Sequence, residues 1–234
     1  AFLSSLPFKL TNAQQHVLNE VLADIGDVTR PMNRLLQGDV GSGKTVIALA
    51  ALLVAATSGY QAAIMAPTEI LAEQHFLTVN RLLGGLICHT EGEYLLSVRI
   101  GSIEKPVTVG LLLGSMAVTE KRKMRRLLAE GSLDLIIGTH ALIQDEMEIP
   151  RLALAVVDEQ HRFGVLQRAS LRRHDERAHL LVMSATPIPR TLALTLYGDL
   201  DISTIDELPF GRRAVRTKVI TPSRRANVYD FLRK

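Results

Sequence analysis

Gly38-Asp39-Val40-Gly41-Ser42-Gly43-Lys44-Thr45 fits the phosphate-loop pattern G-x-x-x-x-G-K-[ST] at every fixed position. Glycines let a backbone wrap closely around a polyphosphate, because they tolerate dihedral angles that a Cβ atom forbids. The backbone N–H groups of such a loop point inward, and the following helix adds its positive N-terminal end. We therefore expect Lys44 to neutralise the β and γ phosphates of a nucleoside triphosphate, and Thr45 to offer its hydroxyl to Mg²⁺.

The sequence on either side of this loop has the pattern that the motif requires. Residues 34–37 are apolar enough for a short buried strand, and residues 46–56 are nearly all apolar, as in a buried helix. Strand, loop and helix in this order are the context in which the motif binds phosphate. The flanks therefore predict a nucleotide-binding α/β fold rather than a glycine turn that binds nothing.

Further apolar segments alternate with helical patterns along the chain. The predicted strands are residues 62–66, 107–113, 135–137, 154–157 and 180–183, and the predicted helices are residues 12–25, 69–83 and 119–130. Strands without polar alternation that are separated by helices form a parallel sheet covered on both faces. The sequence therefore predicts an α/β domain of three layers, with a mainly parallel central sheet.

Polar residues or glycines follow each predicted strand directly. They are Gly38, Pro67-Thr68, Gly114-Ser115, Gly138-Thr139-His140, Asp158-Glu159 and Ser184-Ala185-Thr186. Ligands of open parallel sheets bind at the carboxyl ends of the strands. We therefore expect this row of residues to line one edge of the sheet.

Asp158-Glu159 is the second chemical element. A phosphate-loop ATPase needs one carboxylate to hold Mg²⁺ and another to orient and deprotonate the attacking water, and these residues suit the two roles in that order. A zinc site is not expected, because no H-E-x-x-H or Cys/His pair spacing occurs. Serine hydrolase chemistry is not expected either, because no G-x-S-x-G follows a strand.

Length, charge and cysteine content set broad limits. The chain has 234 residues, 47% of them hydrophobic, which suits one large α/β domain or one domain plus a fragment of a second. The net charge of +3 is compatible with a nucleic-acid partner without requiring one. The cations of the predicted helix 119–130 form either a nucleic-acid patch or a solvated face, and they are Lys121, Arg122, Lys123, Arg125 and Arg126. The single cysteine, Cys88, favours a reducing compartment, and we expect a cytoplasmic protein without a membrane anchor.

Two stretches depart from the alternating pattern. Residues 84–106 contain a partial period of two at 94–100, which indicates an excursion such as a hairpin or a loop. The tail after residue 216 suggests a strand at 218–220 and a helix beginning near Ser223. We expect a domain over residues 1–215 and a linker, or the start of a further domain, over residues 216–234. The chain opens on Ala1 rather than Met, which suggests a fragment of a longer protein.

The motifs, in their order and spacing, resemble those of superfamily 2 helicases. The phosphate loop, Pro67-Thr68-Glu69, Gly138-Thr139-His140, Asp158-Glu159-Gln160-His161 and Ser184-Ala185-Thr186 are similar to motifs I, Ia, Ib, II and III. More narrowly, APTEILAEQH at 66–75, DEQHRFGVLQR at 158–168 and SATPIPRTLALTLYGDLD at 184–201 resemble the RecG family of bacterial DNA helicases. Transcription-repair coupling factors look similar, but their second motif usually reads Asp-Glu-Glu-His, so Gln160 favours RecG. The resemblance covers nearly the whole chain apart from residues 84–106.

The resemblance implies a role for individual residues. Adenine would be recognised by Gln14 with Phe8 upstream, although Gln14 by itself is typical of an exposed helical residue. ATP and Mg²⁺ would be held by the phosphate loop and Asp158, with Glu159 activating water. Gln160 and His161 would link the nucleotide state to Ser184 and Thr186. The DNA backbone would be contacted by Thr68, Thr139 and His140, whose alternative role is to cap helices.

The resemblance also implies an activity. RecG-like helicases couple ATP hydrolysis to translocation on double-stranded DNA, and they remodel stalled replication forks and Holliday junctions in recombination and repair. They carry a wedge domain and a second RecA-like lobe whose arginine completes the ATP site, and such an arginine contributes roughly 10³–10⁵ in rate. We therefore expect this chain alone to bind nucleotide weakly and to hydrolyse it slowly or not at all. Three alternatives stay open: a translocase like the coupling factor, a small-molecule kinase, and a nucleotide-gated binding module without turnover.

Overall fold

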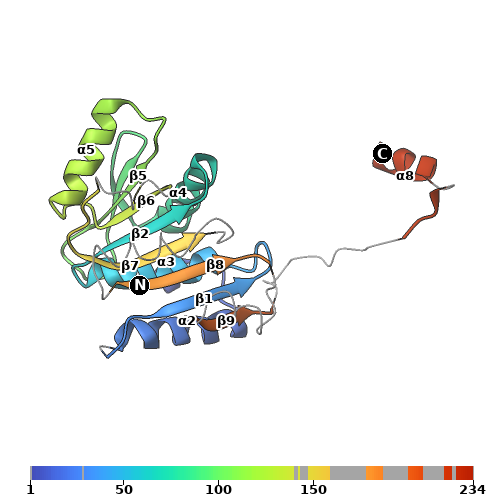
Figure 1. Cartoon of the computed structure of the whole chain (residues 1–234), viewed down its shortest axis with the longest axis horizontal. Coiled ribbons are helices and arrows are strands. Elements are labelled where there is room, and N and C mark those ends of the chain that lie inside the picture. Colours follow the sequence, from blue (N-terminus) through green and yellow to red (C-terminus); the bar gives the residue numbers. More distant parts are fainter. Residues whose placement is uncertain are drawn as a thin grey trace.

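The computed structural model describes residues 2–27, 29–139, 142, 147–158, 178–186, 200–207, 219–222 and 225–233. Within this part of the chain, nine strands form one sheet in the order β3-β4-β5-β6-β2-β7-β8-β1-β9 (Figure 1). The strands are β1 (Asn33–Gly38), β2 (Gln61–Ala66), β3 (Ile87–Glu91), β4 (Leu95–Val98), β5 (Val107–Leu112), β6 (Leu135–Thr139), β7 (Leu152–Asp158), β8 (His179–Ser184) and β9 (Asp201–Ile205). The helices are α1 (Phe2–Ser5), α2 (Asn12–Gly26), α3 (Lys44–Thr57), α4 (Glu69–Leu83), α5 (Val118–Ala129) and α8 (Arg225–Leu232), with a 3₁₀ turn, η1, at Gly84–Leu86.

The seven strands β5, β6, β2, β7, β8, β1 and β9 pair parallel to one another. Among the described strands, only the pairs β3–β4 and β4–β5 are antiparallel, so β4 alone runs against the other strands. The prediction of an α/β fold with a mainly parallel sheet is therefore confirmed. The phosphate-loop strand β1 lies between β8 and β9, and β7 lies on the other side of β8. The carboxyl ends of these parallel strands consequently meet at one edge of the sheet.

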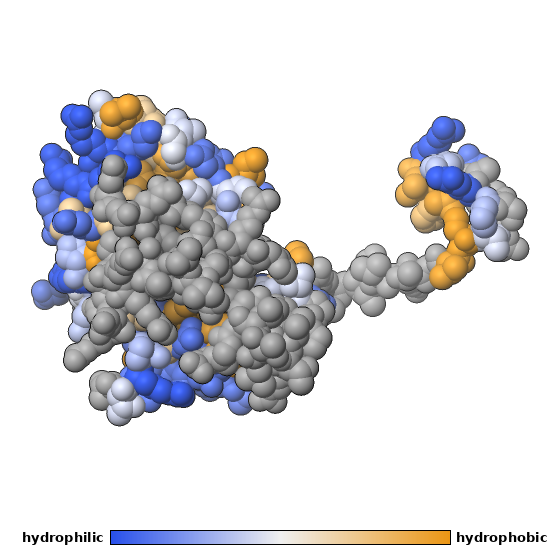
Figure 2. Space-filling model, in the orientation of Figure 1, coloured by the Kyte–Doolittle hydropathy of each residue, from blue (hydrophilic) through white to orange (hydrophobic). Residues whose placement is uncertain are grey.

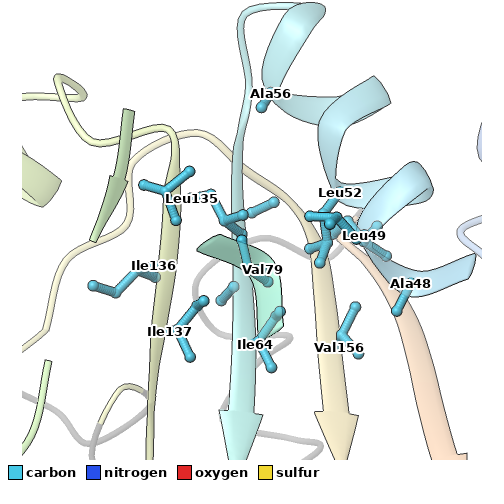
Figure 3. Close-up of a cluster of buried hydrophobic side chains, with 14 of the residues drawn as sticks. Ala48, Leu49, Leu52, Ala56, Ile64, Val79, Leu135, Ile136, Ile137 and Val156 are labelled. Atoms are coloured by element: carbon cyan, nitrogen blue, oxygen red, sulfur yellow. The ribbon is translucent and has the colours of Figure 1, made fainter. Parts of the chain in front are cut away.

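Helix α3 is buried on nearly all sides because almost all of its residues are apolar. It contacts α2 and α4 as well as β1, β2 and β7. Leu49 and Leu52 of α3 face Ile64 of β2 and Val156 of β7 in the core cluster that Figure 3 shows. These buried side chains come from one helix and two strands. Their packing fixes the position of α3, and with it the loop at the N-terminus of α3.

Helix α2 begins where the sequence predicted. Thr11 is its N-cap: the Thr11 hydroxyl accepts a hydrogen bond from the Gln14 N–H, and the Gln14 side chain accepts one from the Thr11 N–H. This reciprocal arrangement satisfies two backbone donors that a helix N-terminus would otherwise leave without partners.

The stretch 84–106 contains the hairpin of β3 and β4. Strand β4 pairs antiparallel with β5, so the hairpin extends the sheet at one end. Among the predicted elements, the strand at 218–220 is not found: Val219 and Ile220, the two of its residues that the structure describes, lie outside any strand. Strand β9 was not predicted.

Helix α8 lies apart from the sheet (Figure 1) and was expected to begin near residue 223. Hydrophobic residues are exposed on it and on the segment before it, as the orange atoms in Figure 2 show. They are Val219, Ile220, Tyr229, Phe231 and Leu232. None of the described helices has the length and apolar character that a membrane span requires.

Candidate nucleotide-binding site

The phosphate loop joins the end of β1 to the start of α3. Gly41 and Gly43 have φ angles of 78° and 95°, a region that side chains with a Cβ rarely adopt. A Cβ on Gly43 would lie 2.3 Å from the Gln14 side-chain nitrogen, so the position also lacks room for one. Both glycines are therefore required by the shape of the loop, as the sequence motif predicts.

Gln14 of α2 holds this loop from outside. Its side-chain nitrogen donates a hydrogen bond of 2.7 Å to the Ser42 carbonyl oxygen, while its side-chain oxygen accepts from the Thr11 N–H at 2.9 Å. Only 3% of Gln14 is exposed, so the expectation of an exposed helical residue, drawn from Gln14 alone, is wrong. Phe8, the other residue expected near adenine, has 44% of its surface exposed.

Lys44 is the first residue of α3, and its side chain folds back over the loop. The Lys44 Nζ lies 2.6 Å from the carbonyl oxygen of Gly38 and 3.0 Å from that of Asp39. The Ser42 hydroxyl is buried and makes no hydrogen bond. A buried hydroxyl without a hydrogen-bond partner inside a glycine loop is a donor available to an anionic ligand.

Lys44, Thr45 and Asp158 line one cavity of about 280 Å³. Lys44 and Thr45 come from the start of α3, and Asp158 is the last residue of β7. The structure thus brings together the cation of the phosphate loop and the first carboxylate of the second motif, as the sequence predicts. The same cavity is also lined by residues of α4, which are Leu71, Gln74, His75 and Thr78.

His75 is a site residue that the sequence reasoning missed. Its Nε2 lies 2.6 Å from Oδ2 of Asp158, and the two side chains are only 11% and 15% exposed. The signal that would have found it is helical spacing, because residues 71, 74, 75 and 78 recur on one face of α4. That face lines the cavity, and only His75 of the four residues is buried.

Ser184, the last residue of β8, and Thr186, two positions later, are connected to each other and to β1. The two hydroxyls lie 2.9 Å apart, and the Thr186 N–H donates to the Ser184 hydroxyl at 3.2 Å. Gln37 of β1 donates to the Thr186 carbonyl oxygen at 3.2 Å. This turn is therefore tied to the strand that carries the phosphate loop. The predicted residues Glu159, Gln160, His161 and His140 lie outside the described residues.

Thr139 is the last residue of β6, and Thr68 follows the neighbouring parallel strand β2. The Thr68 hydroxyl accepts a hydrogen bond from the Leu71 N–H at 3.3 Å, so Thr68 does cap α4. The next residue, Glu69, accepts from the Ser115 N–H at 3.2 Å, and a hydrogen bond from the Ser115 side chain holds the pKa of the Glu69 carboxyl below its usual value. The segment that follows β2 is thereby linked to the segment that follows β5.

The cations of α5 are partly engaged within the chain. Lys123 pairs with Glu91 of β3 at 2.6 Å, and Lys121 donates to the Gly114 carbonyl oxygen at 2.8 Å. The Arg126 guanidinium lies 3.8 Å from the carboxylate of the residue four positions later. These contacts favour a solvated helix face over a free nucleic-acid patch.

Comparison with known proteins places this chain in a family. A family model described as DEAD/DEAH box helicase matches residues 11–195, which is most of the chain. The chain belongs to the DEAD/DEAH box helicase family. Members of this family use ATP, which agrees with a cavity formed by a phosphate loop and a strand-terminal aspartate.

Among curated members of this helicase family, the chain is similar to RecG proteins. It is 49% identical over 233 residues to the "ATP-dependent DNA helicase RecG" of Synechocystis, and 47% identical over 234 residues to that of Bacillus subtilis. The resemblance to RecG is confirmed. Both matches cover 100% of this chain, yet only 26% and 31% of the relatives, so the chain spans about a quarter to a third of their length. Each match therefore extends across residues 84–106, the stretch that the motif resemblance does not cover.

Solved helicase structures agree. A RecG bound to a three-way DNA junction matches with a TM-score of 0.80 and 43% identity, over 100% of this chain and 28% of its own. A DEAD box protein from Methanococcus jannaschii matches with a TM-score of 0.55 and 20% identity, over 84% of this chain and 50% of its own. The second likeness concerns the fold alone.

Proposed function

We propose that this chain is the ATP-binding lobe of a RecG-like DNA helicase, an enzyme that couples ATP hydrolysis to movement on double-stranded DNA. The observation that carries the proposal is the single cavity lined by Lys44, Thr45 and Asp158. The similarity to RecG proteins over the whole chain supports the choice of this helicase over a coupling-factor translocase or a binding module without turnover.

The polyphosphate of ATP binds in the phosphate loop. Lys44 leaves the carbonyl oxygens of Gly38 and Asp39 and neutralises the β and γ phosphates, while loop N–H groups and the start of α3 hold the other oxygens. The backbone of residues 38–45 provides this cradle. Gln14 and Phe8 lie on the adenine side, with Gln14 also fixing the loop through Ser42.

The residues present suit Mg²⁺, because the Thr45 hydroxyl and the Asp158 carboxylate are oxygen ligands that line the same cavity. The ion held there would supply positive charge against the β and γ phosphates. Thr45 and Asp158 are the two residues that would hold it. Glu159, next to Asp158, orients the attacking water and accepts its proton.

Nucleotide state reaches DNA through the second and third motifs. Gln160 and His161 follow the catalytic carboxylates, and Ser184 and Thr186 form the turn that Gln37 connects to β1. Loss of the γ phosphate can therefore shift this turn, and with it the strand ends at the edge of the sheet. Thr68 and Thr139, at strand ends of this edge, contact the DNA backbone together with His140, the next residue in the sequence. Hydroxyl and N–H donors bind phosphate there without reading the base sequence.

The substrate is branched DNA, such as a stalled fork or a Holliday junction, in recombination and repair. The similarity to a RecG bound to a three-way junction supports this choice. A second RecA-like lobe and a wedge domain are the partners in the longer protein, with residues 1–215 as the lobe and 216–234 as the linker or start of the next. The exposed apolar side chains of α8 suit docking against such a partner. The cytoplasm, where DNA is present in bacteria, is the proposed location.

Nucleotide binding and turnover test this function. The wild-type chain should bind a fluorescent ATP analogue in the presence of Mg²⁺, and Lys44→Ala should lose most of this binding. Glu159→Gln should keep it, because the carboxylate acts on water rather than on ATP. ATP turnover by the chain alone should be slow with or without branched DNA, since the arginine of the second lobe is worth roughly 10³–10⁵ in rate. A Lys44→Ala variant that binds like the wild type would contradict the proposal.

A further inference from the structure

We propose that His75 is a positioning residue for Asp158: it holds the Asp158 carboxylate in one orientation for the metal ion of a bound nucleotide. The inference rests on the proposed function, in which Asp158 is a metal ligand. It adds a residue outside the phosphate loop and outside the strand-terminal acidic motif.

The contact between the two residues is short and shielded. The Nε2–Oδ2 distance of 2.6 Å joins side chains that are 11% and 15% exposed and 83 positions apart in the chain. A carboxylate that binds a metal ion only accepts hydrogen bonds, so in this proposal the imidazole Nε2 is the donor. Little water competes for this bond, which makes it stronger than an exposed equivalent.

His75 is itself held in place by α4. Its neighbours Ala72, Phe76 and Val79 are buried in the core, and α4 packs on β2, β5 and β6. Figure 3 shows Val79 pointing into the core cluster beside Ile64 of β2. The imidazole is therefore presented from a fixed helix rather than from a loop.

Asp158, by contrast, needs a partner to fix its orientation. It is the last residue of β7, where its backbone pairs with Met183 of β8, while its side chain extends into the cavity with Lys44 and Thr45. A side chain at a strand end retains rotamer freedom, and a hydrogen bond to one carboxylate oxygen removes much of it. Outer partners that orient metal-binding groups typically contribute 10- to 100-fold in metal affinity.

The test measures Mg²⁺ dependence rather than turnover. Binding of a fluorescent ATP analogue to the 234-residue chain is titrated with Mg²⁺, and repeated in EDTA, for the wild type, His75→Leu and His75→Gln. His75→Leu removes the donor at similar volume, and His75→Gln keeps an N–H donor. His89→Leu, at an exposed position on β3, is the matched control. Thermal melting verifies that each variant folds.

The half-saturating Mg²⁺ concentration should rise about tenfold in His75→Leu, with binding in EDTA unchanged. His75→Gln should recover most of the difference, and His89→Leu should match the wild type. An unchanged Mg²⁺ requirement in His75→Leu would overturn the inference, and so would an equal loss of binding in Mg²⁺ and in EDTA, which marks a purely structural role. A wild-type chain that binds no nucleotide would overturn the proposed function as well, so the two failures are distinguishable.

Discussion

The side-chain amide of Gln14 donates a 2.7 Å hydrogen bond to the backbone carbonyl of Ser42. The two residues are 28 positions apart, one in the first turn of α2 and the other inside the phosphate loop. The other end of the same amide accepts from the N–H of Thr11. The start of α2 and the phosphate loop are therefore held as one unit before any nucleotide binds.

Gln14→Ala should loosen the loop. Removing a buried hydrogen bond of this kind costs about 1–3 kcal/mol, because the Ser42 carbonyl and the Thr11 N–H both lose a partner. We expect the affinity for an ATP analogue to fall roughly tenfold and the melting temperature to fall with it. Gln15→Ala, at the neighbouring exposed position, should change neither quantity. Equal affinities for the two variants would show that the loop keeps its shape without Gln14.

Gly43→Ala should abolish nucleotide binding. Its φ of 95° disfavours a Cβ, and the added atom would lie 2.3 Å from the Gln14 side-chain nitrogen. Gly59→Ala is the matched control, because Gly59 has a φ of 85° and nothing within 4 Å of the added atom. Both variants should lose about 1–3 kcal/mol of stability through backbone strain. Titration with the ATP analogue should show a binding defect in the Gly43 variant alone.

Stability should fall when the pH drops below about 6.5 because of His179. Burial lowers the pKa of the His179 imidazole, an effect that the nearby Asp24 carboxylate opposes, so the folded state favours the neutral form. The neutral Nδ1 accepts a hydrogen bond of 2.9 Å from the Met32 N–H. The stabilisation is therefore complete above the unfolded pKa, near 6.5, and decreases as the pH falls through the lowered folded value.

His179→Asn tests this assignment, because an asparagine oxygen accepts a hydrogen bond and does not titrate. Urea unfolding at pH 7.5 and pH 5.5 should show a smaller loss of stability in this variant than in the wild type. His16→Asn, at an exposed position on α2, should leave the difference as it is. An identical pH dependence in all three proteins would assign the effect to other groups.

Arg34→Ala should destabilise the fold severely. The Arg34 guanidinium is buried, donates to Asp24 at 2.7 Å and to Ser203 at 2.7 Å, and so joins β1 to α2 and β9. Removing one partner of a buried ion pair costs about 3–5 kcal/mol, because an uncompensated charge remains. Arg30→Ala breaks the exposed pair with Asp201 and should cost at most about 1 kcal/mol. Chemical unfolding of the two variants should separate these values clearly, and similar losses would contradict the assignment of Arg34 as a buried anchor.

The sequence predicts the parallel strands well because both faces of the sheet are buried. Short uninterrupted apolar runs such as residues 135–137 and 154–157 are typical of strands that are buried on both faces of a parallel sheet. Strand β9 escapes this signal: Asp201, Thr204 and Ser203 interrupt its apolar residues, and its position depends on pairing with β1. For residues 84–106 the sequence does not distinguish a hairpin from a loop, because β4 also depends on a partner strand, β5.

The sequence brings candidate site residues forward where a local motif carries the proposed chemistry. Lys44, Thr45 and Asp158 each follow a pattern within a few neighbouring residues, and the cavity unites them. His75 has no such pattern, because its role arises from contact with a residue 83 positions away. Gln14 has a local role as a helix-cap partner, but its bond to the phosphate loop depends on how α2 packs against α3.

The place of β1 between β8 and β9 has a consequence for biosynthesis. Met32, which precedes β1, is bonded to His179, 147 positions later, so a ribosome must deliver most of the chain before this strand gains either neighbour. At roughly 5–20 residues per second, that delay is about 7–30 seconds. Until then β1 has two unsatisfied edges, and we expect nascent chains to present them to chaperones.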